Sequence, residues 1–136
     1  MALSRSEYRV YITSSLWRDK HQEWLKQVGY QCPVSFKKVG KGGKYNCHHT
    51  NYKRLGEEIF FLDIIPLNPW VHKNIVHGVL SGWKPAGQQK HYPNAPQRIF
   101  HNYCRMMLIV QALLRIIWRV TKTILRITLR LLGVIK

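Results

Sequence analysis

The pattern of apolar and polar positions predicts one amphipathic helix early in the chain. Ser14 or Ser15 can cap a helix that runs to about Val28. Gly29 follows at once and is typical of the position at which a helix ends. The apolar side of this helix comprises Trp17, Trp24, Leu25 and Val28. Residues 7–13 alternate loosely between apolar and polar side chains, so we expect a short extended segment before the helix.

The middle of the chain predicts shorter elements. Residues 32–46 combine lysines with three glycines, which favours a turn-rich basic hairpin. A strand-like segment at residues 48–49 and a loop follow, and residues 58–67 are largely apolar. After Pro69 we expect a second helix, and residues 81–97 form a connector rich in Gly and Pro.

Residues 98–132 form one long helical pattern. Its basic side chains fall within roughly 80° of arc, and they are Arg115, Arg119, Lys122, Arg126 and Arg130. Most of the remaining surface is apolar and is wider than a single core contact needs. Three interpretations follow. The helix packs on its own domain or self-associates, it lies in an anionic membrane interface, or it tracks a nucleic-acid backbone. Self-association or membrane contact would use residues 104–132.

Charge indicates the kind of partner. The 136 residues contain 22 Lys+Arg and 6 Asp+Glu, a formal net charge of +16. Such an excess favours a polyanionic partner, nucleic acid first and an anionic membrane second. No acidic residue occurs from Ile64 onward, so the C-terminal half is the stronger attractor.

The cysteines and the apolar runs indicate the compartment. Cys32, Cys47 and Cys104 are an odd number without paired spacing, which argues against a disulfide framework and fits a reducing compartment. We expect Cys47 and Cys104 to be small core residues. The N-terminus has no apolar signal core, and the longest apolar run, 106–110, is too short for a membrane span. We therefore expect a cytoplasmic protein, with peripheral membrane attachment through the C-terminal helix as the alternative location.

Four of the seven histidines fall into two clusters, His48 with His49 and His72 with His77. Imidazole can bind a divalent metal ion or take a proton from water. Adjacent residues of an extended segment point to opposite sides, so His48 and His49 can do different work. One can face a metal while the other faces water. His21, His91 and His101 have no partner in sequence and are expected at the surface.

With these residues, the stretch from about 8 to 78 resembles the HNH endonucleases of the ββα-metal type. The motifs that carry the resemblance are Tyr8 to Trp17, His48-His49-Thr50-Asn51-Tyr52, Gly56-Glu57-Glu58, Asp63-Ile64-Ile65-Pro66-Leu67 and His72…His77-Gly78. We therefore expect an α+β fold: a ββα-metal (HNH-like) module with an N-terminal helix and a long C-terminal amphipathic helix. The expected organisation is a nuclease domain at 1–80, a connector at 81–97 and a basic helical tail at 98–136.

The resemblance also implies the roles of individual residues. His48 would be a metal ligand and His49 the general base. Asp63 stands where the family has its central Asn, which orients the base and staples the loop. His72 would be a further ligand and His77 the last one. Together they imply one divalent ion, Mg²⁺, Mn²⁺ or Zn²⁺.

Two departures from the family pattern stand out. The family usually places its last two histidines four residues apart, whereas His72 and His77 are five apart. On an ideal helix this spacing rotates them about 140° from each other, so the helix has a bulge, it ends early, or His77 is not a ligand. Many members of the family carry a structural zinc knuckle made of two Cys-x-x-Cys pairs. In this chain the first pair, at 32–35, keeps one cysteine and the second, at 68–71, keeps none, so we expect no structural zinc.

The leading prediction is a metal-dependent endonuclease that hydrolyses DNA phosphodiester bonds. Basic side chains expected to contact the nucleic-acid backbone are Lys37, Lys38, Lys41, Lys44, Lys53 and Arg54. For the last two, a solvated loop is an equally good interpretation. The alternative function is a catalytically degenerate HNH-fold basic protein, acting as a nucleic-acid-binding or membrane-associated component of a larger assembly.

Overall fold

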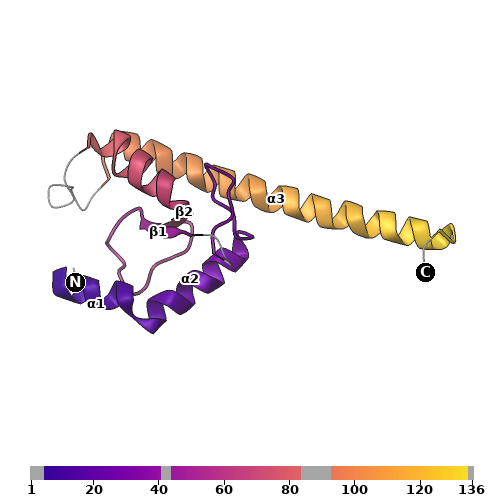
Figure 1. The fold of residues 1–136 in the computed structure, drawn as a ribbon, viewed down its shortest axis with the longest axis horizontal. Coiled ribbons are helices and arrows are strands. Elements are labelled where there is room, and N and C mark those ends of the chain that lie inside the picture. The colour runs from indigo at the N-terminus through magenta and orange to yellow at the C-terminus, as the bar shows by residue number, and fades with distance from the viewer. Residues whose placement is uncertain (1–4, 41–43, 84–92, 135–136) are drawn as a thin grey trace.

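The computed structural model describes residues 5–40, 44–83 and 93–134, and it is a mixed α+β arrangement (Figure 1). A two-stranded antiparallel sheet lies between helical segments, and the last helix extends well beyond the rest of the molecule. The elements in chain order are α1 (Arg5–Thr13), α2 (Ser15–Gln27), β1 (Asn46–His49), β2 (Ile64–Leu67), the π-helix η1 (Val71–Val76), the 3₁₀ turn η2 (Val79–Ser81) and α3 (Ala95–Leu131).

The expectation of an extended segment before the first long helix is wrong, because residues 5–13 form α1. Tyr8, Tyr11 and Ile12 recur at the helical spacing of three and four residues, and all three are partly buried. α2 follows as expected, with Ser14 as its N-cap: the Ser14 hydroxyl accepts the backbone N–H of Trp17 at 3.1 Å. The loose apolar–polar alternation of residues 7–13 is a weaker signal than this helical spacing, so the segment is a helix and not a strand.

β1 and β2 pair antiparallel and set the position of the histidine pair. His48 lies opposite Ile65 and His49 opposite Ile64. The loop between the strands closes with a 2.7 Å hydrogen bond from the Thr50 N–H to the Asp63 carbonyl. A basic hairpin was expected at residues 32–46. The structure has one antiparallel bridge in this region, between Gln31 and Lys38, and residues 41–43 lie outside the described part.

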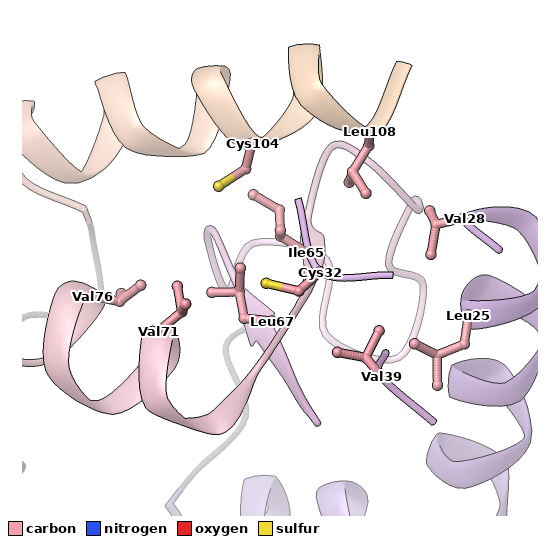
Figure 2. Packing of buried hydrophobic residues seen from close by; sticks show 10 residues of the cluster. All are labelled: Leu25, Val28, Cys32, Val39, Ile65, Leu67, Val71, Val76, Cys104 and Leu108. Atoms are coloured by element: carbon pink, nitrogen blue, oxygen red, sulfur yellow. The ribbon is translucent and has the colours of Figure 1, made fainter. Parts of the chain in front are cut away.

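The core lies between β2, α2, η1 and the first half of α3 (Figure 2). Cys104 and Leu108 come from α3 and are fully buried. Figure 2 shows them over the strand residues Ile65 and Leu67. Cys104 is thus a small core residue, as expected, and burial raises the pKa of its thiol to about 12. The start of the segment expected as a tail therefore contributes to the core.

α3 begins slightly earlier than its pattern predicted and is continuous for 37 residues. Asn94 caps it in a capping box: Gln97 donates its backbone N–H to the Asn94 side chain at 2.8 Å, and the Gln97 side chain accepts the Asn94 backbone N–H. Pro96 stands in the first turn, where its missing N–H has no helical partner to lose. Among the described residues, no helix combines the length and the apolar character needed to cross a membrane.

Candidate metal centre

Strand β1 directs its two histidines to opposite sides, as the alternation of an extended chain requires. The ring of His48 contacts the rings of His72, His77 and His101, with centroids 5.1–5.6 Å apart. The ring of His49 instead lies among Tyr8, Trp17 and Tyr52. The sequence expectation that these two side chains point to opposite sides of the strand is confirmed.

Three histidines form a compact group of donors. One ring nitrogen from each of His48, His72 and His77 lies within 4.8 Å of the other two. The Nε2 atoms of His72 and His77 are 3.1 Å apart. Residues far apart in sequence, one on β1 and two at η1, are thus brought to one point.

The π-helix accounts for the unusual spacing of His72 and His77. In η1 the backbone N–H of His77 donates to the carbonyl of His72, five residues earlier, at 3.1 Å. A wider helical turn of this kind places residues i and i+5 above one another, where an α-helix would place i and i+4. Their ring centroids are 4.4 Å apart. The bulge considered from the sequence therefore exists, and it places His77 beside His72.

The three histidines could hold a divalent ion. Two nitrogens bound tetrahedrally at zinc distances stand about 3.4 Å apart, close to the 3.1 Å between His72 and His77. The three donor nitrogens lie within 4.8 Å of one another, so closing to this separation takes a movement of up to about 1.4 Å, within the reach of side-chain rotation. Burial, followed by the neighbouring imidazoles, keeps the pKa of His48 well below its usual value, and burial lowers that of His72 to about 4. Both rings are neutral at neutral pH, so each has a lone pair to donate.

A fourth histidine reaches this group from α3. His101 is buried, and its Nε2 lies 3.1 Å from Nε2 of His48. The expectation that His101 and His21 lie at the surface is wrong, since both are buried; His91 lies outside the described residues. One signal could have found His101: it precedes Cys104 and Leu108 by three and seven residues, on the same helix face.

His49 is held by aromatic rings and one carboxylate. It stacks on Trp17, with centroids 4.8 Å apart and planes 8° apart, and on Tyr52 at 5.2 Å and 19°. Its Nε2 lies 3.5 Å from Oε1 of Glu58. With Nε2–H directed at this carboxylate, the ring's lone pair sits on Nδ1, the nitrogen left to accept a proton.

Glu58 is a second site residue that sequence reasoning missed, having been noted only as part of a turn motif. The Tyr11 hydroxyl donates to its Oε2 at 2.6 Å, the Gly56 N–H to its Oε1 at 3.0 Å, and the Lys20 ammonium lies 3.1 Å from Oε2. Burial alone would raise the pKa of Glu58, but the hydrogen bonds from His49, Tyr11 and the backbone outweigh it and lower the pKa to about 2. The carboxylate facing His49 is therefore ionised.

Asp63 staples the loop between the strands. Its carboxylate accepts hydrogen bonds from Asn51 at 2.6 Å, from Arg54 at 2.8 Å through two nitrogens, and from the Ile59 N–H at 2.9 Å. These contacts match the loop-closing half of the role expected for Asp63. Around His49, the carboxylate within 3.5 Å of the ring is that of Glu58.

A cavity of about 480 Å³ joins the two histidine environments. Its lining includes both members of the pair together with Tyr8, Ile12, Trp17, His21, Tyr45, Asn46, Cys47, Tyr52, His72 and His77. A ligand in this cavity would therefore contact His48, His72 and His77 together with His49.

The basic residues predicted from the sequence divide into three cases. Those that are exposed at the surface are Lys37, Lys38, Lys44 and Lys53. Arg54 is exposed but is paired with Asp63 through two hydrogen bonds, so part of its guanidinium is occupied. Lys41 lies outside the described residues. Lys44 and Lys53 each adjoin a tyrosine that lines the cavity, Tyr45 and Tyr52.

Comparison of the chain with protein-family models finds no match. Comparison with curated proteins finds none, and comparison with solved structures also finds none.

Gly78→Ala is expected to disturb η1 and the two histidines it positions. A Cβ at Gly78 would clash with the Asn74 carbonyl oxygen and would lie 2.8 Å from the Trp83 ring. The backbone contact cannot be relieved by rotating a side chain, so we expect the free energy of unfolding to fall by about 1–3 kcal/mol. Urea denaturation measures this change. The exposed neighbour Val79→Ala is the matched control, and equal stability of the two variants would contradict the prediction.

Acid is expected to destabilise the protein through Glu58. Its folded-state pKa of about 2 lies below the ordinary value of 4.5, so its contribution is present above about pH 4.5 and is lost as the pH falls toward 2. After allowance for solvent screening we expect a loss of about 2 kcal/mol. Urea denaturation between about pH 6 and pH 3 measures it. Glu58→Gln should flatten this slope while exposed Glu57→Gln retains it; the same slope in both would contradict the assignment.

Proposed function

We propose that this protein is a metal-dependent endonuclease with an HNH-like (ββα-metal) module that hydrolyses phosphodiester bonds in DNA. The observation that carries the proposal is the convergence of His48, His72 and His77 on one side of β1, while His49 lies on the other side of the same strand. All four histidines line one cavity. The order of two antiparallel strands followed by the short helix η1 supports this proposal.

Each residue has a defined role in this proposal. His48, His72 and His77 would hold the ion, which when bound stabilises negative charge on the phosphate and the leaving oxygen. His49 takes a proton from the attacking water on Nδ1, and the ionised Glu58 stabilises the imidazolium that forms. Trp17 and Tyr52 restrict the ring of His49 to one plane. Three imidazoles form a donor set better suited to Zn²⁺ or Ni²⁺ than to Mg²⁺.

The charge distribution supports a nucleic-acid substrate. The net charge of +16 attracts a polyanion. Exposed Lys44 and Lys53 are the sequence neighbours of Tyr45 and Tyr52, which line the cavity, and this supports phosphate contacts near it. Contacts of this kind position the backbone without reading its sequence. The choice of DNA over RNA comes from the family resemblance.

His101 would support His48 in metal binding. A histidine ligand is usually held by a second group, and loss of that group weakens metal affinity about 10–100-fold. The 3.1 Å contact between the Nε2 atoms of His48 and His101 is the basis for this expectation. We therefore expect His101→Ala to bind Zn²⁺ about 10-fold or more weakly, as measured by calorimetry. Exposed Arg98→Ala on the same helix is the control, and wild-type affinity in His101→Ala would contradict the expectation.

Nicking of supercoiled plasmid tests the proposed activity. The full chain, freed of metal with a chelator, is incubated with plasmid and, in separate reactions, Mg²⁺, Mn²⁺, Zn²⁺ or Ni²⁺. We expect open-circular product with at least one of these ions and none in chelator. Plasmid binding without nicking under every ion would refute the proposed activity and favour the non-catalytic, nucleic-acid-binding alternative.

A further inference from the structure

Helix α3 presents two opposite faces, and one of them packs on the domain. Its buried residues are His101, Cys104, Leu108 and Gln111, which recur at three and four residues along one side. Arg105, beside them, donates to the backbone carbonyls of Phe61 and Leu62. This face fixes the first half of α3 to the rest of the molecule. The second half extends beyond the domain (Figure 1).

The opposite face of α3 carries an uninterrupted apolar repeat. Its ten members are alternately four and three residues apart, and each is 38–83% exposed: Ile99, Tyr103, Met106, Val110, Leu113, Ile117, Val120, Ile124, Ile127 and Leu131. We call this set the α3 seam. It spans more than four heptads, or roughly 48 Å of helix.

The spacing of the α3 seam points to a partner helix. A mean spacing of 3.5 residues keeps apolar side chains facing one neighbour along the whole helix when the two supercoil. In heptad notation, positions a run from Tyr103 to Leu131 and positions d from Ile99 to Ile127. Most are Ile, Val or Leu, the residues that such seams use. Contact with a bilayer requires a broad apolar face but no such regular spacing.

The charges on α3 allow two copies of the helix to pair. Arg115 and Lys122 stand at position f, and Arg119 and Arg126 at position c, all on the side away from the seam. Only Arg130 flanks the seam, at position g, near its end. Two copies meeting at the seam therefore keep nearly all their like charges apart.

We propose that a second copy of this chain covers the α3 seam, so that the protein forms a dimer through a coiled coil of two α3 helices. The seam lies opposite the face that holds His101, Cys104 and Leu108, so pairing leaves the domain contacts of α3 intact. The dimer would carry two histidine centres. This inference rests on α3 alone and stands apart from the proposed nuclease activity.

Sedimentation equilibrium of the full chain tests the dimer. The monomer mass is 16.1 kDa, and we expect a wild-type mass of twice that value. The seam variant Ile117→Lys/Ile124→Lys should sediment as a monomer. The control variant Trp118→Lys/Leu125→Lys changes two exposed apolar residues of the same helix off the seam, at position b, and should remain a dimer.

Several outcomes would overturn this proposal. A monomeric wild-type chain would do so, and flotation of that monomer with anionic vesicles would show that a lipid surface covers α3 instead. Equal dissociation of the seam and control variants would show that the whole apolar surface associates without a defined seam. Circular dichroism of both variants checks that α3 stays helical, so that a change in mass reports pairing and not loss of folding.

Discussion

His49→Ala is expected to reduce plasmid nicking by at least about 100-fold while leaving plasmid binding nearly unchanged. A positioned general base typically contributes 10²–10⁴-fold to the rate. The ionised carboxylate of Glu58 lies 3.5 Å from Nε2 of His49 and holds the ring in place. Because His49 lies outside the group formed by His48, His72 and His77, metal binding should survive the substitution.

The matched control is His21→Ala. His21 lines the same cavity and is also buried, but it belongs to α2 and lies outside both the three-histidine group and the His49–Glu58 contact. Gel-based nicking rates and filter binding of plasmid, measured for both variants, separate catalysis from affinity. Full nicking by His49→Ala would remove it as the base, and an equal loss in both variants would show that the cavity's shape, rather than this ring, controls the rate.

Asp63→Asn is expected to be the most destabilising polar substitution in the loop between β1 and β2. The carboxylate side chain is 1% exposed and accepts hydrogen bonds from Asn51, Arg54 and the backbone of Ile59. An amide at this position places its NH₂ group against donors, so at least one buried hydrogen bond is lost. We expect the free energy of unfolding to fall by about 3 kcal/mol.

Urea denaturation at neutral pH measures this loss, with exposed Glu57→Gln as a control that removes a neighbouring carboxylate from the same loop. The control should change stability by less than about 0.5 kcal/mol. A stability equal to that of the control would contradict the stapling role.

Local features of the site could be predicted from the sequence. The opposite orientations of His48 and His49 follow from strand alternation alone, and the cap at Ser14 follows from side-chain chemistry next to an amphipathic pattern. These features depend on a few consecutive residues. The hydrogen-bonding partners of the two histidines, in contrast, come from other parts of the chain.

The features that were missed depend on contacts distant in the chain. His101 joins His48 across 53 residues, and Tyr11 reaches Glu58 across 47. A single sequence carries no signal for such pairs beyond the helical phase of His101. The five-residue spacing of His72 and His77 was compatible with a bulged helix or with a helix that ends early. The structure has the bulged form, the π-helix η1. The ββα-metal identity of the module stays a prediction.

Metal stoichiometry is the most direct test that the three imidazoles share one ion. The chelator-treated chain is titrated with Zn²⁺ by calorimetry and its metal content is then determined by mass spectrometry. We predict one ion per chain, with affinity falling at least about 100-fold in His72→Ala and in His77→Ala. Lys73→Ala, an exposed residue of the same helix, should leave affinity unchanged. Absence of binding, or binding that survives loss of either histidine, would contradict the account.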